Sequence, residues 1–147
     1  MIRRIGREDR RQYIALAKAF YASDAVLEEI PEEHIAEAFD EMMRSREYIE
    51  GFFLMADQDT VAGYAVVAKS FSQEAGGMVL WVDELFLLPE HRSLGLGQEF
   101  FAFVQKNLQP TVKRIRLEVE GENGKAISLY RRLGFERLPY VQMVLDP

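Results

Sequence analysis

The chain of 147 residues contains no cysteine, which excludes disulfides, thiolate metal sites and a cysteine nucleophile. No apolar run approaches the ~20 residues that cross a bilayer. The N-terminal segment MIRRIGREDRRQYIAL has no apolar stretch after its basic residues, unlike a signal peptide. The lack of cysteine agrees with a reducing compartment. We therefore expect a cytoplasmic protein with no membrane partner.

Positive charge is also scarce, and the formal net charge is −6. A negative field disfavours binding to nucleic acid or to anionic membranes. The shortage is local, because no Lys or Arg occurs from Ala19 to Met43. That segment carries Asp24, Glu28, Glu29, Glu32, Glu33, Glu37, Asp40 and Glu41. This pattern favours a cationic partner, although an acidic surface also serves solubility alone.

Several catalytic and nucleotide-binding patterns are missing. His34 and His91 stand apart from each other, so we expect no metal site. The glycine loop ending at Gly97 is followed by Gln98-Glu99 rather than Lys-Ser/Thr, and no third glycine stands near Phe100. These features exclude a P-loop and a dinucleotide fingerprint. There is no Gly-x-Ser-x-Gly motif either.

The spacing of apolar residues predicts alternating strands and helices. We expect strands over 1–5, 51–56, 61–71, 78–88, 115–120 and 141–145. We expect helices over 8–21, 32–44 and 98–108, and a fourth around 126–133. Hydrophobic residues make up 48% and charged residues 29%, which suits one globular domain over residues 1–147. The fold class is α/β (α+β), a mixed sheet flanked by helices.

The strand predicted over 78–88 carries two adjacent carboxylates, Asp83 and Glu84, inside an apolar run. A buried carboxylate without partners is costly, so both must meet water, cations or hydrogen-bond donors. Adjacent strand residues point to opposite faces, so we expect one acid to support the structure while the other lines a cavity. A satisfied core acid, or a strand end that reaches solvent, is the alternative.

A glycine loop follows that strand. Gly95 and Gly97 leave backbone N–H groups uncovered, and the next helix points its positive N-terminus at the loop. A strand, a glycine loop and a helix start together favour an anion site, most often for phosphate. His91 and Arg92 add cationic groups beside it. A glycine turn that only caps the helix is the alternative.

A third segment, NGKAISLYRRLGF, places Tyr130 on the apolar stripe of a helix. Together the three segments resemble the GNAT superfamily of acyl-CoA-dependent N-acetyltransferases. The family's acetyl-CoA motif, Arg/Gln-x-x-Gly-x-Gly/Ala, is present at 92–97, with Ser93 where glycine is usual. The second motif, Asn-x-x-Ala-x-x-Leu-Tyr-x-x-x-Gly-Phe, is matched by Asn123, Ala126, Leu129, Tyr130, Gly134 and Phe135. Within the family, the segment WVDELFLLPEHRSLGLGQEF is most similar to the spermidine/spermine acetyltransferase-like branch.

The resemblance implies a mostly antiparallel central sheet whose fourth and fifth strands splay apart to admit the pantetheine arm of acetyl-CoA. Leu85, Phe86 and Leu87 would hydrogen-bond that arm through their backbone. Around the diphosphate the resemblance places Arg92, Ser93, Leu94, Gly95, Leu96, Gly97 and Gln98. Asn123 and Ala126 would contact the cofactor, and Tyr130 would lie near the thioester sulfur.

In such a site a primary amine attacks the thioester directly, so no protein nucleophile is required. Asp83 or Glu84, acting through water, is the candidate base for the amine proton. The Tyr130 hydroxyl is the candidate acid for the departing thiolate. By family analogy the acidic stretch, with Glu28 and Glu29, shapes the acceptor site, and we expect a cationic small-molecule amine as acceptor.

The sequence leaves three alternatives open for the activity. In the first, the acceptor is a lysine or N-terminal amine of a protein. In the second, the domain binds acyl-CoA without catalysis, and in the third, the transferred acyl group is longer than acetyl. A homodimer, common in this family, would form through the last strand or the sheet edge.

Overall fold

The computed structural model describes residues 1–26 and 28–147. The elements are, in chain order, β1 (Ile2–Arg4), a 3-10 turn (Arg7–Asp9), α1 (Arg10–Tyr21), α2 (Glu32–Arg44), β2 (Ile49–Met55), β3 (Val61–Ser72), β4 (Gly77–Leu87), a second 3-10 turn (Pro89–His91), α3 (Leu96–Lys106), β5 (Val112–Leu117) and α4 (Gly124–Arg132). All the predicted elements except the last strand are present. In this described part of the chain, no helix is long and apolar enough to cross a bilayer.

The five strands form one mixed sheet in the order β1-β2-β3-β4-β5. Strands β1 to β4 pair antiparallel, whereas β4 and β5 pair parallel. The parallel pairing runs from Met78↔Val112 to Val82↔Leu117 and then stops, while β4 continues to Leu87. The predicted fold class is confirmed, including the splay between the fourth and fifth strands.

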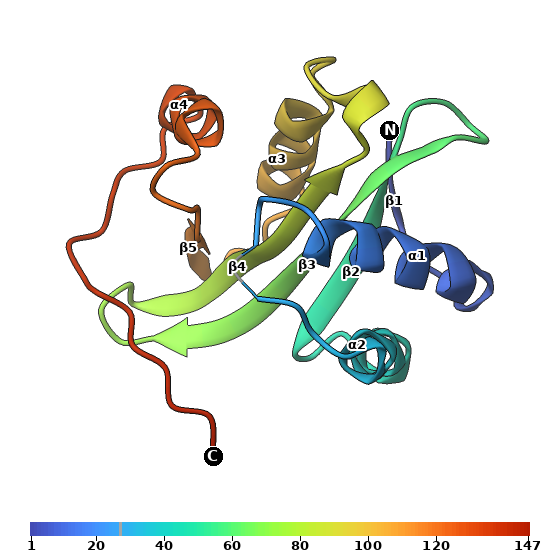
Figure 1. Ribbon diagram of the computed structural model, residues 1–147. Coiled ribbons are helices and arrows are strands. Elements are labelled where there is room, and N and C mark those ends of the chain that lie inside the picture. The colour runs from blue at the N-terminus through green and yellow to red at the C-terminus, as the bar shows by residue number, and fades with distance from the viewer. Residues whose placement is uncertain (27) are drawn as a thin grey trace.

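Helices cover both faces of the sheet (Figure 1). Because side chains alternate along a strand, Phe53 and Tyr64 pack with α1 and α2 on one face. Leu54 and Val82 pack with α3 on the other face. Helix α4 lies beyond β5 and contains no fully buried residue, so it is the most weakly anchored of the helices in residues 1–26 and 28–147.

The strand predicted over 141–145 is wrong, because the structure has no regular element after α4. Val141 is 89% exposed and Met143 is 94% exposed, so no neighbouring strand or helix buries this segment. Figure 1 shows the C-terminal tail running past the turn between β3 and β4 and ending away from the sheet. The tail touches that turn through the Tyr140 hydroxyl, which donates to Glu74 Oε2 at 2.9 Å.

Candidate active site

A β-bulge at Asp83 sets the geometry of the two adjacent acids. Val66 pairs with Glu84 and Val67 with Val82, so Asp83 is left without a partner on β3. A bulge interrupts the alternation of side chains and re-aims its neighbours. As a result, both acids line the same pocket, and the prediction that only one of them lines a cavity is wrong.

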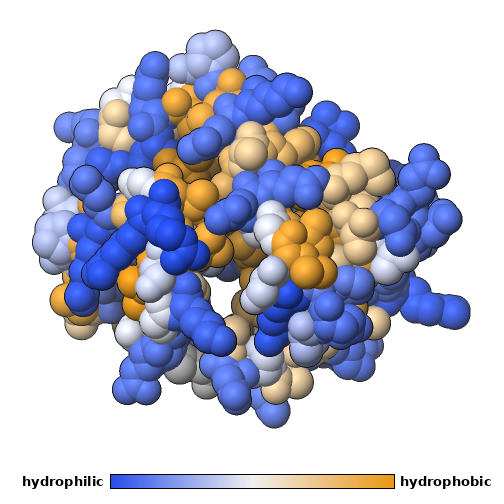
Figure 2. All heavy atoms as spheres, turned by 90° about the horizontal axis from the view of Figure 1, so that it is seen from above, coloured by the Kyte–Doolittle hydropathy of each residue, from blue (hydrophilic) through white to orange (hydrophobic). Residues whose placement is uncertain are grey.

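The pocket lies where β4 and β5 separate and has a volume of about 100 Å³. Its lining residues are Phe20, Ala25, Val82, Asp83, Glu84, Leu85, Leu117, Glu118, Val119, Glu120, Asn123, Ala126 and Tyr130. Four of these are acids, and none of the lining residues in the described chain is Lys or Arg. Figure 2 shows the molecule from above, and both hydrophilic and hydrophobic side chains border a hollow in that face.

Two of the four acids, Glu118 and Glu120, were missed by the sequence analysis. Glu118 follows β5 directly and Glu120 lies two residues further on, and β5 runs parallel to β4. Because the carboxyl ends of parallel strands meet at the same edge of a sheet, their side chains arrive beside Asp83. Only the parallel pairing of β4 and β5 indicates that these two acids lie in the pocket, and the sequence does not reveal that pairing.

Two phenol groups hold the carboxylate of Glu84. The Tyr64 hydroxyl donates to Glu84 Oε1 at 2.6 Å, and the Tyr21 hydroxyl donates to Oε2 at 2.8 Å. Burial raises the pKa of Glu84, the two phenol hydrogen bonds partly oppose this, and the charge of Asp83 adds to the rise. The net effect is a carboxylate that holds its proton more tightly than an exposed one and is therefore a stronger base.

Asp83 is the more exposed of the pair. Desolvation by the surrounding protein nevertheless raises the pKa of Asp83, and the negative charge of Glu118 raises it further. Both adjacent acids are thus tuned toward basicity, in the direction that general-base catalysis near neutral pH requires.

The loop before α3 is open to an anion. Gly95 caps the helix with a left-handed φ of 85°, and no side chain caps the first turn. A Cβ built at Gly95 meets no atom within 4 Å, and one built at Gly97 meets only Leu129 Cδ2 at 3.8 Å. The space beside the backbone of Gly95 and Gly97 is therefore open, as close approach of a diphosphate to the start of the helix requires.

Arg92 lies along the end of β4, beside this loop. Its Nε donates to the Leu87 carbonyl at 2.9 Å, and its guanidinium stands 5.7 Å from the centre of the Phe86 ring. These contacts place a permanent positive charge next to the strand edge that β5 leaves unpaired.

The second motif reaches the pocket from α4. Asn123 Oδ1 accepts the Ala126 backbone N–H at 3.3 Å and so caps the helix, and both residues line the pocket. Tyr130 packs edge-on against Phe101 and Phe135, with ring centres 5.8 and 5.9 Å away. Burial raises the pKa of the Tyr130 hydroxyl, so it keeps its proton well above neutral pH.

The structure does not bring Glu28 and Glu29 into the pocket. Both are exposed in the segment between α1 and α2, and among the described residues of that segment only Ala25 lines the pocket. The acids that border this pocket beside Asp83 and Glu84 are instead Glu118 and Glu120, which follow β5.

The sequence profile of the acetyltransferase (GNAT) family matches residues 14–135. The chain belongs to this family. It is accordingly an acetyltransferase that uses acetyl-CoA, and the family resemblance seen in the sequence is confirmed.

Solved structures of GNAT-like proteins show the same fold. A possible acetyltransferase from Clostridium difficile 630 has a TM-score of 0.84 at 17% identity, over 100% of this chain and 97% of that one. The protein AAC(6')-Iy, solved with the bisubstrate analogue CoA-S-monomethyl-acetylneamine, has a TM-score of 0.82 at 18% identity, over 100% and 97%. A ribosomal-protein-alanine N-acetyltransferase from Brucella melitensis biovar Abortus 2308 has a TM-score of 0.72 at 16% identity, over 99% of both chains. A search of the curated proteins gave no match.

The one departure from the GNAT glycine motif now has a structural meaning. Ser93 has a φ of 62°, in the left-handed region that costs a residue with a Cβ roughly 1–2 kcal/mol. Glycine, usual at this position in the family, adopts the same conformation without that cost. This chain keeps the loop geometry despite the strain at Ser93.

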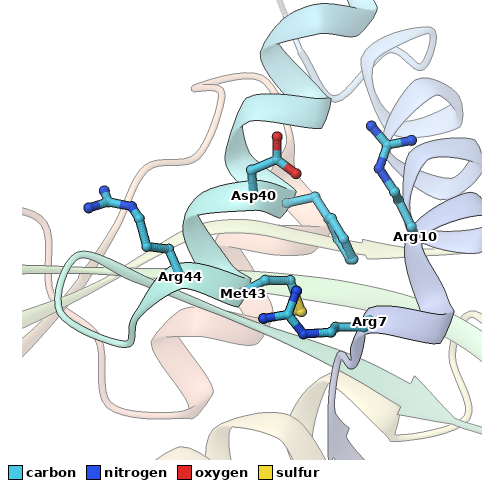
Figure 3. Close-up of a pocket in the computed structure, with 6 residues that line it drawn as sticks. Arg7, Arg10, Asp40, Met43 and Arg44 are labelled. Carbon is cyan, nitrogen blue, oxygen red and sulfur yellow. The ribbon is translucent and has the colours of Figure 1, made fainter.

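A larger and shallower cavity lies elsewhere, between α2 and the start of α1 (Figure 3). Its volume is about 490 Å³, and its lining includes Arg7, Arg10 and Arg44 around Asp40. It shares no lining residue with the pocket at the strand splay, and its charge is mostly of the opposite sign. Of the GNAT motif residues, Asn123, Ala126 and Tyr130 line the smaller pocket, and none lines this larger cavity.

Proposed function

We propose that the protein transfers the acetyl group of acetyl-CoA to a primary amine of a cationic small molecule. The observation that carries this proposal is the set of four carboxylates that line the pocket at the strand splay. A positively charged acceptor offsets the mutual repulsion of these acids, whereas an anionic acceptor would add to it.

The residues present fit the donor, acetyl-CoA, which supplies the thioester that the amine attacks. The open loop of Ser93–Gln98 and the first turn of α3 offer uncovered N–H groups for the diphosphate. The unpaired edge of Leu85–Leu87 offers backbone groups to the pantetheine arm, and Asn123 and Ala126 border its path. Arg92 adds a positive charge at the junction of loop and strand.

Glu84 is our candidate for accepting the amine proton, with Asp83 beside it. An alkylammonium has a pKa of about 10.4, so reaching the neutral amine at pH 7 costs ~4–5 kcal/mol. A buried base and a desolvated pocket offset part of this cost. Each Glu84 oxygen accepts one phenol hydrogen bond and keeps further acceptor capacity toward a water or the amine.

Tyr130→Phe is expected to lower kcat about tenfold or more while leaving KM nearly unchanged. The substitution keeps the ring packed against Phe101 and Phe135 and removes only the hydroxyl that is proposed to protonate the thiolate. Steady-state release of free thiol measures the change. If the variant turns over at the wild-type rate, Tyr130 is a packing residue and not the acid.

An acceptor panel tests the substrate class. We expect diamines, polyamines and polycationic aminoglycosides to exceed neutral monoamines in kcat/KM by at least about tenfold, since the pocket carries four acids. Free thiol released from acetyl-CoA is the readout. A preference for neutral or acidic amines would contradict the cationic acceptor.

The same acceptor panel also tests two other activities: acetylation of a protein, and binding of acyl-CoA without transfer. The likeness to AAC(6')-Iy supports a small-molecule acceptor, and the likeness to a ribosomal-protein-alanine N-acetyltransferase supports a protein acceptor. Peptides with a lysine or a free N-terminal amine therefore belong in the panel. Saturable CoA binding without any transfer would instead favour an acyl-CoA-binding module.

Location in the cytoplasm stays a prediction of the sequence.

We also propose that the protein is a homodimer in which the C-terminal tail of each copy pairs with β5 of the other. Strand β5 is an edge strand, and the tail exposes Val141, Met143 and Leu145. Unpaired strand edges and exposed apolar strand sequences favour pairing between chains. Light scattering coupled to gel filtration should give a dimer for the full chain and a monomer after removal of residues 140–147. A monomeric full-length chain would contradict this arrangement.

A further inference from the structure

The pocket acid Glu84 is held by neighbours that the GNAT motifs do not include. Tyr64 lies on β3 and is fully buried, and Tyr21 is the last residue of α1. Their hydroxyls each donate to a different oxygen of the carboxylate, at 2.6 and 2.8 Å. We propose that Tyr21 and Tyr64 are positioning residues that fix Glu84 as an oriented, ionisable base. The proposal rests on the function proposed above.

Aromatic side chains pack against both phenol rings. The Tyr64 ring meets Tyr13 edge-on at 5.5 Å and lies 6.2 Å from both Phe20 and Phe86. The Tyr21 ring meets Phe20 edge-on at 5.0 Å. With these contacts the two hydroxyls reach the carboxylate from two different elements, one at each oxygen, and so define its direction.

The use of phenols rather than a cation has a chemical consequence. A Lys or Arg beside Glu84 would orient it equally well, but the full positive charge would lower the pKa of the carboxyl and weaken the base. It would also repel an ammonium group entering the pocket. Neutral phenols orient the carboxylate and stabilise its ionised form while leaving it basic and attractive to an amine.

The titratable groups that interact with Glu84 are Asp83 beside it on β4, Tyr13 and Tyr21 from α1, and Tyr64 from β3. Glu118 and Glu120 line the same pocket from the segment after β5. The phenol pKa values of Tyr21 and Tyr64 are both raised, chiefly by burial and also by the charge of Glu84. The two phenols therefore stay protonated as donors over the working pH range, and Glu84 and Asp83 are the groups that titrate.

The test measures the protonation of Glu84 directly, by ¹³C NMR of protein labelled at glutamate carboxyls, with the signal assigned by its loss in Glu84→Gln. Removing either donor hydroxyl, in Tyr64→Phe or Tyr21→Phe, is expected to move the titration midpoint of Glu84 to higher pH. In an active enzyme, kcat/KM at pH 7 should fall about tenfold, the worth of one hydrogen bond to a charged group. The acid limb of the kcat/KM profile should move in the same direction as the NMR midpoint.

Tyr13→Phe is the matched control, because it removes a buried hydroxyl from the same aromatic cluster without removing a donor to Glu84. Its Glu84 midpoint should stay close to that of the wild type. An unmoved midpoint in folded Tyr21→Phe or Tyr64→Phe, or an equal movement in all three variants, overturns the proposal. Tyr21 is only partly buried, so its variant keeps the test open if Tyr64→Phe fails to fold.

The NMR titration needs no substrate, so it separates this inference from the proposed function. If the midpoints move as expected but no amine accepts acetyl, the proposed function fails and the phenol pair stands. Suppose instead that wild type and both donor variants transfer acetyl at similar rates, and that the acid limb of the kcat/KM profile does not move. The positioning role of Tyr21 and Tyr64 then fails and the proposed function stands.

Discussion

Gly97→Ala is expected to weaken CoA binding by at least about tenfold without destabilising the fold. A Cβ at this position meets only Leu129 Cδ2 at 3.8 Å, an ordinary contact, and Gly97 has no left-handed φ. Alanine also favours a helix over glycine by up to ~1 kcal/mol. The added methyl group, however, would stand over the N–H groups that diphosphate oxygens must approach to about 2.9 Å.

Isothermal titration with CoA and thermal unfolding measure the two halves of this prediction. Gly121→Ala is the matched control, because a Cβ there meets nothing within 4 Å and the residue lies outside the α3 loop. Gly95→Ala is less informative, since its φ of 85° costs stability whatever the loop binds. If Gly97→Ala binds CoA with the affinity of the wild type, the glycine loop only caps the helix and does not bind the diphosphate.

Glu84→Gln is expected to lower kcat/KM by roughly 100-fold or more, the usual contribution of a general base. Glutamine keeps the size of the side chain and can still accept a hydrogen bond from a phenol, so the change is mainly the loss of the proton acceptor. Asp83→Asn is the comparison variant and should cost less, because Asp83 stands at the bulge with more solvent around it and no phenol partners.

The pH dependence of stability gives an independent check on Glu84. Because the pKa of Glu84 is raised in the folded protein, the folded state keeps this proton to higher pH than the unfolded chain. The stability contribution is complete below the ordinary value of 4.5 and is lost as the pH rises through the raised pKa. Glu84→Gln lacks this component, so its free energy of unfolding should fall less steeply than that of wild type as the pH rises above 4.5. Parallel pH profiles together with undiminished turnover would contradict the role of Glu84.

The positions of the helices were predictable because each carries a clear apolar stripe with a recognisable start or end. The helix predicted over 32–44 coincides with α2, where Pro31 immediately precedes the first turn. Strand β5 was predicted about three residues late, over 115–120 instead of Val112–Leu117. Its alternation of basic and apolar residues marks a strand but not where the pairing with β4 begins.

The candidate site was predictable only in part, because motifs are local and the site is assembled from distant elements. The glycine loop and Tyr130 stand in contiguous patterns and could be named in advance. The bulge at Asp83 depends on the register between β3 and β4, and the partners of Glu84 lie 63 and 20 residues away in the chain. No pattern of spacing reveals such contacts. The apolar residues of the tail predicted a strand, but the tail pairs with no strand of the described chain and its side chains are exposed.

The central claim is that Arg92–Gly97 and the N-terminus of α3 bind the diphosphate of CoA. Isothermal titration of the wild-type protein with CoA, and in parallel with pantetheine, which lacks the diphosphate and the 3′-phosphoadenosine attached to it, tests it most directly. We expect saturable binding of CoA with an affinity at least about tenfold above that of pantetheine, since charge-assisted hydrogen bonds to the diphosphate are lost in the shorter ligand. No saturable binding of CoA, or equal affinity for the two ligands, would contradict it.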